Sequence, residues 1–129
     1  MNEPTESQIQ AVSTAPRITP ADIENNIVAE YSFTADKAMG AGAPLMPSLS
    51  RLTFCVLVLR NGFTVTGESA CASPENFDAE IGRKIARANA VAKCWPLLGY
   101  ELRTRLHERS RIPNPAHGAP RPPNHRPVA

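Results

Sequence analysis

The chain has 129 residues, of which 13 are proline, and its formal net charge is +2 at pH 7. This length leaves room for one small domain and excludes a large multi-domain enzyme. The longest unbroken apolar run, residues 54–59, is far shorter than the roughly 20 residues that a membrane-spanning helix needs, so no membrane protein is expected.

The charge and the prolines are unevenly distributed. Residues 1–50 carry a net −4, whereas residues 51–110 and 111–129 carry +3 each. The small total does not by itself indicate binding to nucleic acid. Residues 1–17 and 111–129 lack apolar periodicity, so we expect a disordered N-terminal tail and a Pro-rich disordered C-terminal tail. The expected folded unit is a single domain over 18–110.

A helix is predicted near residues 20–32. Thr19 suits an N-cap, Pro20 suits the first helical position, and Asp22 places a carboxylate in the first turn. A short turn is expected to begin at Thr34, and the Gly- and Pro-containing segment 39–50 is expected to be a loop. Within the helix, apolar side chains recur at helical spacing, at Ile23, Ile27, Val28 and Tyr31.

The strongest local feature is a β-hairpin with strands at about 51–60 and 63–71. Asn61-Gly62 joins the two runs and suits a two-residue type I′ turn, which pairs Arg60 with Phe63. One face is then expected to be the core, with Leu52, Phe54, Val56, Val58, Phe63, Val65 and Cys71. The other face is half apolar, with Thr53, Cys55, Leu57, Leu59, Thr64, Thr66 and Glu68.

Part of this second face needs a cover, because a lone hairpin is marginal in water. The predicted helix at 20–32 offers only one narrow apolar stripe, and the long C-terminal helix is expected on the core face. We therefore predict that a second copy of the chain covers Cys55, Leu57 and Leu59, which gives a homodimer through the hairpin. The N-terminal helix is the alternative cover.

A long C-terminal helix is predicted after the start signal Ser73-Pro74. Pro96 removes a backbone donor, so we expect one helix from about 74 to 94, a break, and a second helix from about 97 to 109. The fold class is therefore α+β, with an N-terminal helix, a central β-hairpin and a long C-terminal helix broken near Pro96. The expected buried stripe of the long helix is Phe77, Ile81, Ile85, Ala88, Ala92 and Trp95.

The sequence contains no catalytic constellation. Its three cysteines are an odd number without Cys-x-x-Cys spacing, so we expect free thiols and no metal site at Cys55, Cys71 and Cys94. All histidines lie at or beyond the last predicted helix, where nothing rigid holds a base beside a nucleophile, at His107, His117 and His125. We expect a protein that is not an enzyme and that uses no cofactor.

A basic ridge on the long helix is the candidate binding surface, formed by Arg83, Lys84, Arg87 and Lys93. Such a ridge suits phosphates or an acidic protein surface. The alternative is an ordinary solvated helix surface, in which Glu80 pairs with Lys84 one turn later. No aromatic residue lies between these cations, which weakens the case for single-stranded nucleic acid.

The most specific segments are TFCVLVLRNGF with VTGES, SPENFDAEIGRKIAR, and WPLLGYEL. Through them the chain resembles, over about 18–106, a small tailed-bacteriophage protein family named after gene products of coliphage N-four and Shigella phage Sf-six. The resemblance implies a phage or prophage origin and action in the cytoplasm of the bacterial host. It implies no activity and no functional residues.

Two functions are consistent with these observations. The leading hypothesis is a non-enzymatic phage accessory protein that binds a host or phage macromolecule, with a protein as the favoured partner and nucleic acid weakly supported. The alternative is a binder of a small ligand, for instance a nucleotide signal of host defence, with Arg83 and Arg87 meeting its phosphates.

Overall fold

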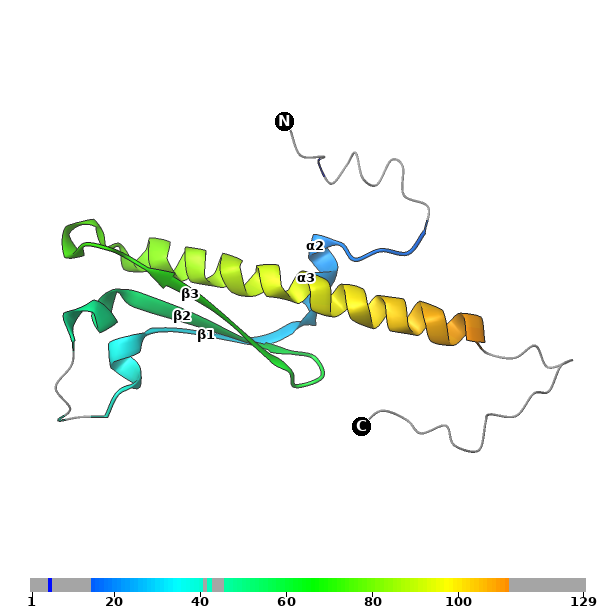
Figure 1. Ribbon diagram of the computed structural model, residues 1–129, viewed down its shortest axis with the longest axis horizontal. Coiled ribbons are helices and arrows are strands. Elements are labelled where there is room, and N and C mark those ends of the chain that lie inside the picture. Colours follow the sequence, from blue (N-terminus) through cyan, green and yellow to red (C-terminus); the bar gives the residue numbers. More distant parts are fainter. Residues whose placement is uncertain (1–4, 6–14, 41, 43–45, 112–129) are drawn as a thin grey trace, which may run out of the picture.

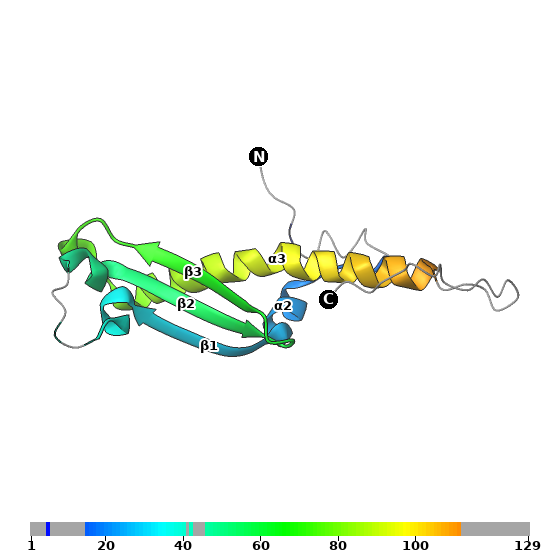
Figure 2. The ribbon, with the colours of Figure 1, turned by 60° about the horizontal axis from the view of Figure 1, so that its bottom comes forward.

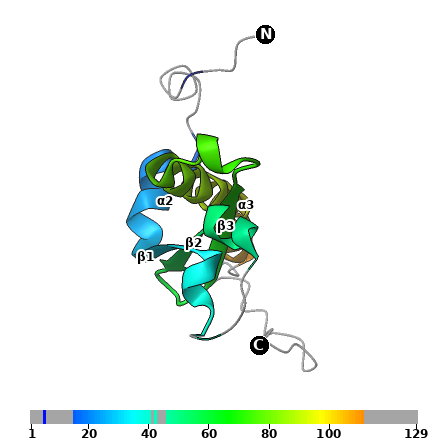
Figure 3. The same cartoon turned by 90° about the vertical axis from the view of Figure 1, so that its left-hand side faces the viewer.

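The computed structural model of the chain describes residues 5, 15–40, 42 and 46–111, and most of the two expected tails lies outside these residues. A three-stranded antiparallel sheet in the order β1-β2-β3 forms one layer, and the long helix α3 lies along one face of it (Figures 1 and 3). The α+β class is confirmed. The elements are α2 (Pro20–Asn26), β1 (Ile27–Thr34), η1 (Ala35–Ala38), η2 (Pro47–Arg51), β2 (Leu52–Leu59), β3 (Thr64–Ala70), η3 (Pro74–Asn76) and α3 (Ala79–Arg111).

The N-terminal helix begins as predicted but ends six residues early. Its start is a capping box, in which the Thr19 amide donates to Asp22 Oδ2 at 2.8 Å and the Asp22 amide donates to Thr19 Oγ1 at 3.2 Å. Residues 27–32, predicted to be helical, instead belong to the edge strand β1, which pairs with β2. A register shift between Ile27 and Ala29 places Ile27 opposite Leu59 on the helix-facing side and Tyr31 opposite Val56 on the outward side.

The hairpin forms, but its register differs by one residue from the prediction. Its loop has three residues, 60–62, and Gly62 takes a positive φ of 90°. The Leu59 amide donates to the Phe63 carbonyl at 2.8 Å, which places Leu57 opposite Val65 and Cys55 opposite Gly67. The two-residue turn and the Arg60–Phe63 pair were wrong, because Asn-Gly marks the turn without fixing how many residues it contains.

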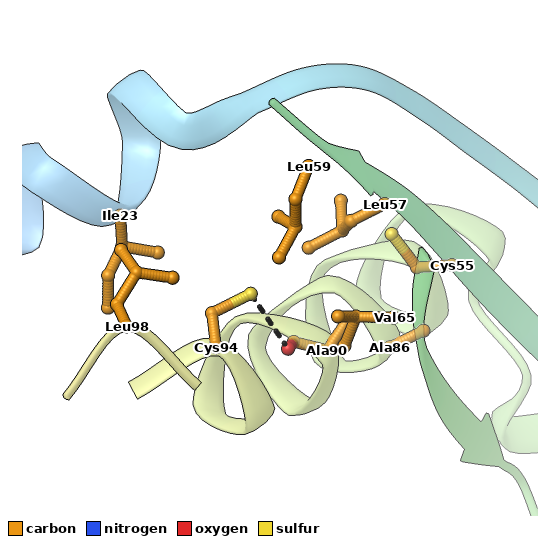
Figure 4. Close-up of a cluster of buried hydrophobic side chains, with 9 residues drawn as sticks. All are labelled: Ile23, Cys55, Leu57, Leu59, Val65, Ala86, Ala90, Cys94 and Leu98. Carbon is orange, nitrogen blue, oxygen red and sulfur yellow. Dashed lines mark hydrogen bonds between the residues drawn. The ribbon is translucent and has the colours of Figure 1, made fainter. Parts of the chain in front are cut away.

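On β2 the two faces are exchanged relative to the prediction, whereas on β3 Val65 lies in the core as predicted. The face of Cys55, Leu57 and Leu59 is buried beneath α3 in the same chain, with exposures of 0%, 0% and 4%. It is therefore not available for the predicted self-association, and this part of the homodimer prediction was wrong. The core of the protein forms here, from Ile23, Cys55, Leu57, Leu59, Val65, Ala86, Ala90, Cys94 and Leu98 (Figure 4).

Helix α3 meets the sheet through small side chains. A Cβ added to Gly67 on β3 would lie 2.2 Å from the Ala86 carbonyl oxygen and 2.3 Å from the Ala90 nitrogen, so the two backbones pack directly together. The predicted stripe was wrong in phase, since Ile81 and Ile85 are 55% and 47% exposed. The stripe that is buried repeats every four residues, at Gly82, Ala86, Ala90, Cys94 and Leu98.

Pro96 lies inside α3 and does not break it. Pro96 and Ala92, one turn earlier, are both exposed, so the carbonyl that loses its intrahelical partner faces water. The helix starts at Ala79, later than predicted, because residues 74–76 form the separate turn η3. Within the described part of the chain, no helix combines the length and apolar composition needed to cross a membrane.

Candidate functional site

Of the four residues of the predicted basic ridge, Arg87 is engaged by other segments of the fold. Arg87 makes an ion-pair clamp that joins three elements: its guanidinium lies 2.7 Å from Glu24 on α2 and 2.8 Å from Glu30 on β1. The hydrogen bond from Arg87 lowers the pKa of the Glu24 carboxyl, and both carboxylates raise the pKa of Arg87. Arg87 is therefore occupied within the fold.

The other three residues of the predicted ridge have different surroundings. Lys84 approaches Glu80 at 3.9 Å in an exposed pair one turn away on the same helix, as expected for a solvated surface. Lys93 is exposed on the later part of α3. Arg83 lines the cavity described next, whereas Arg87 lines a different one together with Glu24 and Glu30.

The larger cavity at the start of α3 has a volume of about 450 Å³. It lies between the end of β1, the turns η1 and η2, and the first turns of α3. Its wall carries two cationic side chains, Lys37 and Arg83, and the carboxylate of Asp36, which accepts a hydrogen bond from Thr34 Oγ1. A volume of this size lies in the range of roughly 300–1,000 Å³ typical of small-molecule pockets.

A second cavity of about 270 Å³ shares Thr53 and Phe77 with the first. Two buried polar atoms in its lining residues, Arg51 Nε and Thr53 Oγ1, have no hydrogen-bond partner, and they are the two such side-chain atoms found in the described residues. Thr53 is 1% exposed. Buried polar atoms without partners are rare in folded proteins, so this wall is the most unusual polar feature of the molecule.

The N-terminus of α3 is already capped by its own chain. Asp78 Oδ1 accepts hydrogen bonds from the amides of Glu80 at 2.9 Å and Ile81 at 3.1 Å. A carboxylate in this position also interacts favourably with the helix dipole. The amides that usually attract an anion to a helix start are therefore partly satisfied, and a ligand would depend on side chains.

The outward face of the sheet is largely apolar, and among the described residues no α-helix covers it, because α2 and α3 both pack on the opposite face (Figure 2). Phe33 and Phe54 stack across β1 and β2 with ring centroids 5.7 Å apart, and Tyr31 is 61% exposed. The sequence analysis missed this surface because it assigned β1 to a helix. The outward positions are Ala29, Tyr31, Phe33, Leu52, Phe54, Val56, Val58, Thr64, Thr66, Glu68 and Ala70.

The positions of the cysteine thiols suit a role in packing. Cys55, Cys71 and Cys94 form no disulfide with one another in this structure. Burial raises the pKa of the Cys55 and Cys94 thiols, which disfavours the nucleophilic thiolate. Among the residues that the structure describes, no cluster of three or more metal-ligating side chains is found, and His117 and His125 lie outside those residues.

Comparison with known proteins identifies the chain at the level of its family. No curated protein and no solved structure matches it. One family model matches residues 18–106, which is more than half of the chain and includes the sheet and most of α3. The chain therefore belongs to the phage protein (N4 Gp49/phage Sf6 gene 66) family.

Proposed function

We propose that this phage protein is a non-enzymatic accessory protein that binds a host or phage protein through the outward face of its sheet. The observation that carries the proposal is the run of Phe54, Val56 and Val58 along the central strand, flanked by Tyr31 and Phe33 on β1. A contiguous apolar patch on a protein surface typically marks an interaction site.

The chemistry of this face favours a protein over a nucleic acid. Glu68 is the one charged residue among its outward strand positions, so it offers no cation for a phosphate backbone. Exposed aromatic side chains such as Tyr31 are the residues that contribute most to protein–protein binding. The expected partner surface is therefore an apolar strip without charge at its centre.

The non-enzymatic part of the proposal is supported by the placement of the reactive groups. Cys55 and Cys94 are buried in the core with raised thiol pKa values. Arg87 is held by two carboxylates, and His107 lies on the exposed last part of α3. None of these groups sits beside a partner that would activate it for catalysis.

The chain provides a matched pair of sites for a test, since it has two tyrosines and both are exposed. A photo-crosslinking phenylalanine analogue replaces Tyr31 on the outward face in one variant and Tyr100 on α3 in the other. During infection, the first variant is expected to form an adduct with a host or phage protein, and the second is not. Equal adducts from both positions, no adduct, or only an adduct of two copies of the chain would contradict the proposal.

A further inference from the structure

We propose that the cavity of about 270 Å³ beneath the first turns of α3 binds a small organic anion, whose oxyanion is held by Arg51 and Thr53. This inference is independent of the protein-binding function proposed above, because Arg51 and Thr53 line a cavity beneath α3, on the opposite side of the sheet from the outward face. Ala70 is an outward position that also lines this cavity, but none of the proposed ligand contacts involves it.

The first argument is the pair of unpartnered polar atoms. Arg51 Nε and Thr53 Oγ1 are both buried without a hydrogen-bond partner, and both residues line this one cavity. Arg51 is the last residue of η2 and Thr53 is the second residue of β2, and both side chains contribute to the wall of this cavity. A ligand in the cavity can contact both of them.

The second argument is the chemistry of these two groups. The guanidinium of Arg51 only donates hydrogen bonds and carries a permanent charge, and the hydroxyl of Thr53 donates equally well. No ion pair of Arg51 is found among the described residues. A carboxylate or another oxyanion is the ligand group that accepts from both and neutralises the charge.

The rest of the wall defines the body of the ligand. Phe77, Ile81 and Ile85 give the cavity an apolar side. Asp78 adds one negative charge, although its Oδ1 is engaged by backbone amides, so a ligand with a single negative charge is favoured over a dianion. The volume lies just below the usual range for drug-sized ligands, so the expected class is a small aliphatic or aryl monocarboxylate.

Along the helix-facing side of β2, only the position beside this cavity is polar. The helix-facing positions of β2 change from Thr53 to Cys55, Leu57 and Leu59 along the strand. Gly82 of α3 lies directly above the first of them, and a Cβ added there would be 2.9 Å from Thr53 Oγ1. At that distance an added Cβ would clash, so glycine at position 82 lets the backbone of α3 approach the Thr53 hydroxyl closely.

The neighbouring larger cavity is the competing location. It shares Thr53 and Phe77 but takes its cations from Lys37 and Arg83. The carboxylate of Asp36 lines the same cavity and offsets part of their charge, so an anion is less strongly required there. Substitution of Arg51 and Arg83, one at a time, separates the two locations.

The experiment titrates the full-length ¹⁵N-labelled protein with benzoate and hexanoate and follows the amide signals of residues 51–53 and 77–85. Saturable shifts at millimolar ligand are expected for both carboxylates. Benzyl alcohol lacks the charge and acetate lacks the apolar body, so each is expected to bind at least about tenfold more weakly. No saturable shift with either carboxylate would overturn the proposal.

Variants then assign the contacts. Arg51→Gln is expected to weaken benzoate binding at least about tenfold. Thr53→Val is expected to weaken binding while raising the melting temperature, because it removes a buried hydroxyl that has no partner. A residue with only a structural role would not lower the affinity for benzoate while raising the melting temperature. The matched controls Arg103→Gln on α3 and Thr66→Val on β3 are expected to bind within about twofold of the unmodified protein.

Two results count against the site even if ligand binds. A larger loss from Arg83→Gln than from Arg51→Gln would place the anion in the neighbouring cavity. Unchanged affinity in Thr53→Val would show that the hydroxyl does not touch the ligand. If Arg51→Gln fails to fold, Arg51→Lys replaces it, and the Thr53→Val result decides.

Discussion

The two faces of the sheet use the same strands in different ways. On the helix-facing side, β2 and β3 present residues that are almost completely buried, such as Leu57 at 0% and Val65 at 5% exposed. On the outward side, the alternating residues of β2 are just as apolar but only partly buried. The comparison shows that apolar composition does not decide which face of a strand becomes the core; the small residues of α3 do, since they allow the helix backbone to approach Gly67.

The strongest test of this comparison is Gly67→Ala. A Cβ at this position would lie 2.2 Å from a backbone oxygen of α3, so the helix must move away from β3. We expect the free energy of unfolding to fall by about 3 kcal/mol or more, measured by urea denaturation. Thr66→Ala, one residue earlier on the outward face, is the control and should change it by less than about 0.5 kcal/mol. Similar losses from both variants would contradict the direct contact of the two backbones.

Truncation of adjacent residues on β2 compares the two faces directly. Leu57→Ala removes a fully buried side chain and is expected to lower the free energy of unfolding by about 2–5 kcal/mol. Val56→Ala removes a half-buried one on the outward face, and its expected cost is below about 1.5 kcal/mol. A larger effect at Val56, measured at several protein concentrations, would indicate that another copy of the chain buries the outward face.

The Arg87 clamp tests the contribution of β1 to stability, because polar residues of this strand lie on its helix-facing side. Arg87→Gln is expected to lower the free energy of unfolding by about 1 kcal/mol near neutral pH, because the ion pairs are partly exposed. The pKa of Glu24 is lowered in the folded state, so its contribution is fully present above its ordinary value of 4.5 and is lost as the pH falls through the folded value. Denaturation midpoints measured from neutral to acidic pH should therefore fall less steeply in Arg87→Gln. An unchanged slope would show that Glu24 gains nothing from Arg87.

The smallest expected effect has the opposite sign. Gly99 lies in α3 with open space around its Cβ position. Gly99→Ala should raise the free energy of unfolding by roughly 0.5–1 kcal/mol, because alanine favours the helix. Thermal denaturation measures the shift, and a decrease would show that the helix is packed at this point. Together, Gly99→Ala and Gly67→Ala test whether the stability effect of replacing a glycine depends on contact between α3 and the sheet at that position.

The sequence predicted those features that depend on short-range chemistry. The capping box at Thr19 and Asp22, the hairpin around Asn61-Gly62 and the long C-terminal helix all follow from local residue preferences. The strand β1 was not predicted, because Ile23, Ile27 and Tyr31 recur every four residues, as in a helix. Pairing with β2 makes residues 27–34 a strand instead, and that contact is not local in the sequence.

The candidate sites show the same division between local and long-range information. Arg83, Lys84, Arg87 and Lys93 were recognised as cations on one helix, but only the structure shows that Arg87 is held by two carboxylates from distant segments. Arg51 and Thr53 carry no sequence signal of their own. Their unpartnered atoms become visible once α3 is placed over β2.

Helix α3 continues well past the sheet that supports it (Figure 1). Its last buried residue is Leu98, and residues 99–111 follow with no buried side chain. A segment of this length is close to the limit below which an isolated helix is marginal in water, so it depends on continuity with the packed half. Amide hydrogen exchange should therefore divide α3 into two regions, slow before Leu98 and fast after it, within one uninterrupted helix.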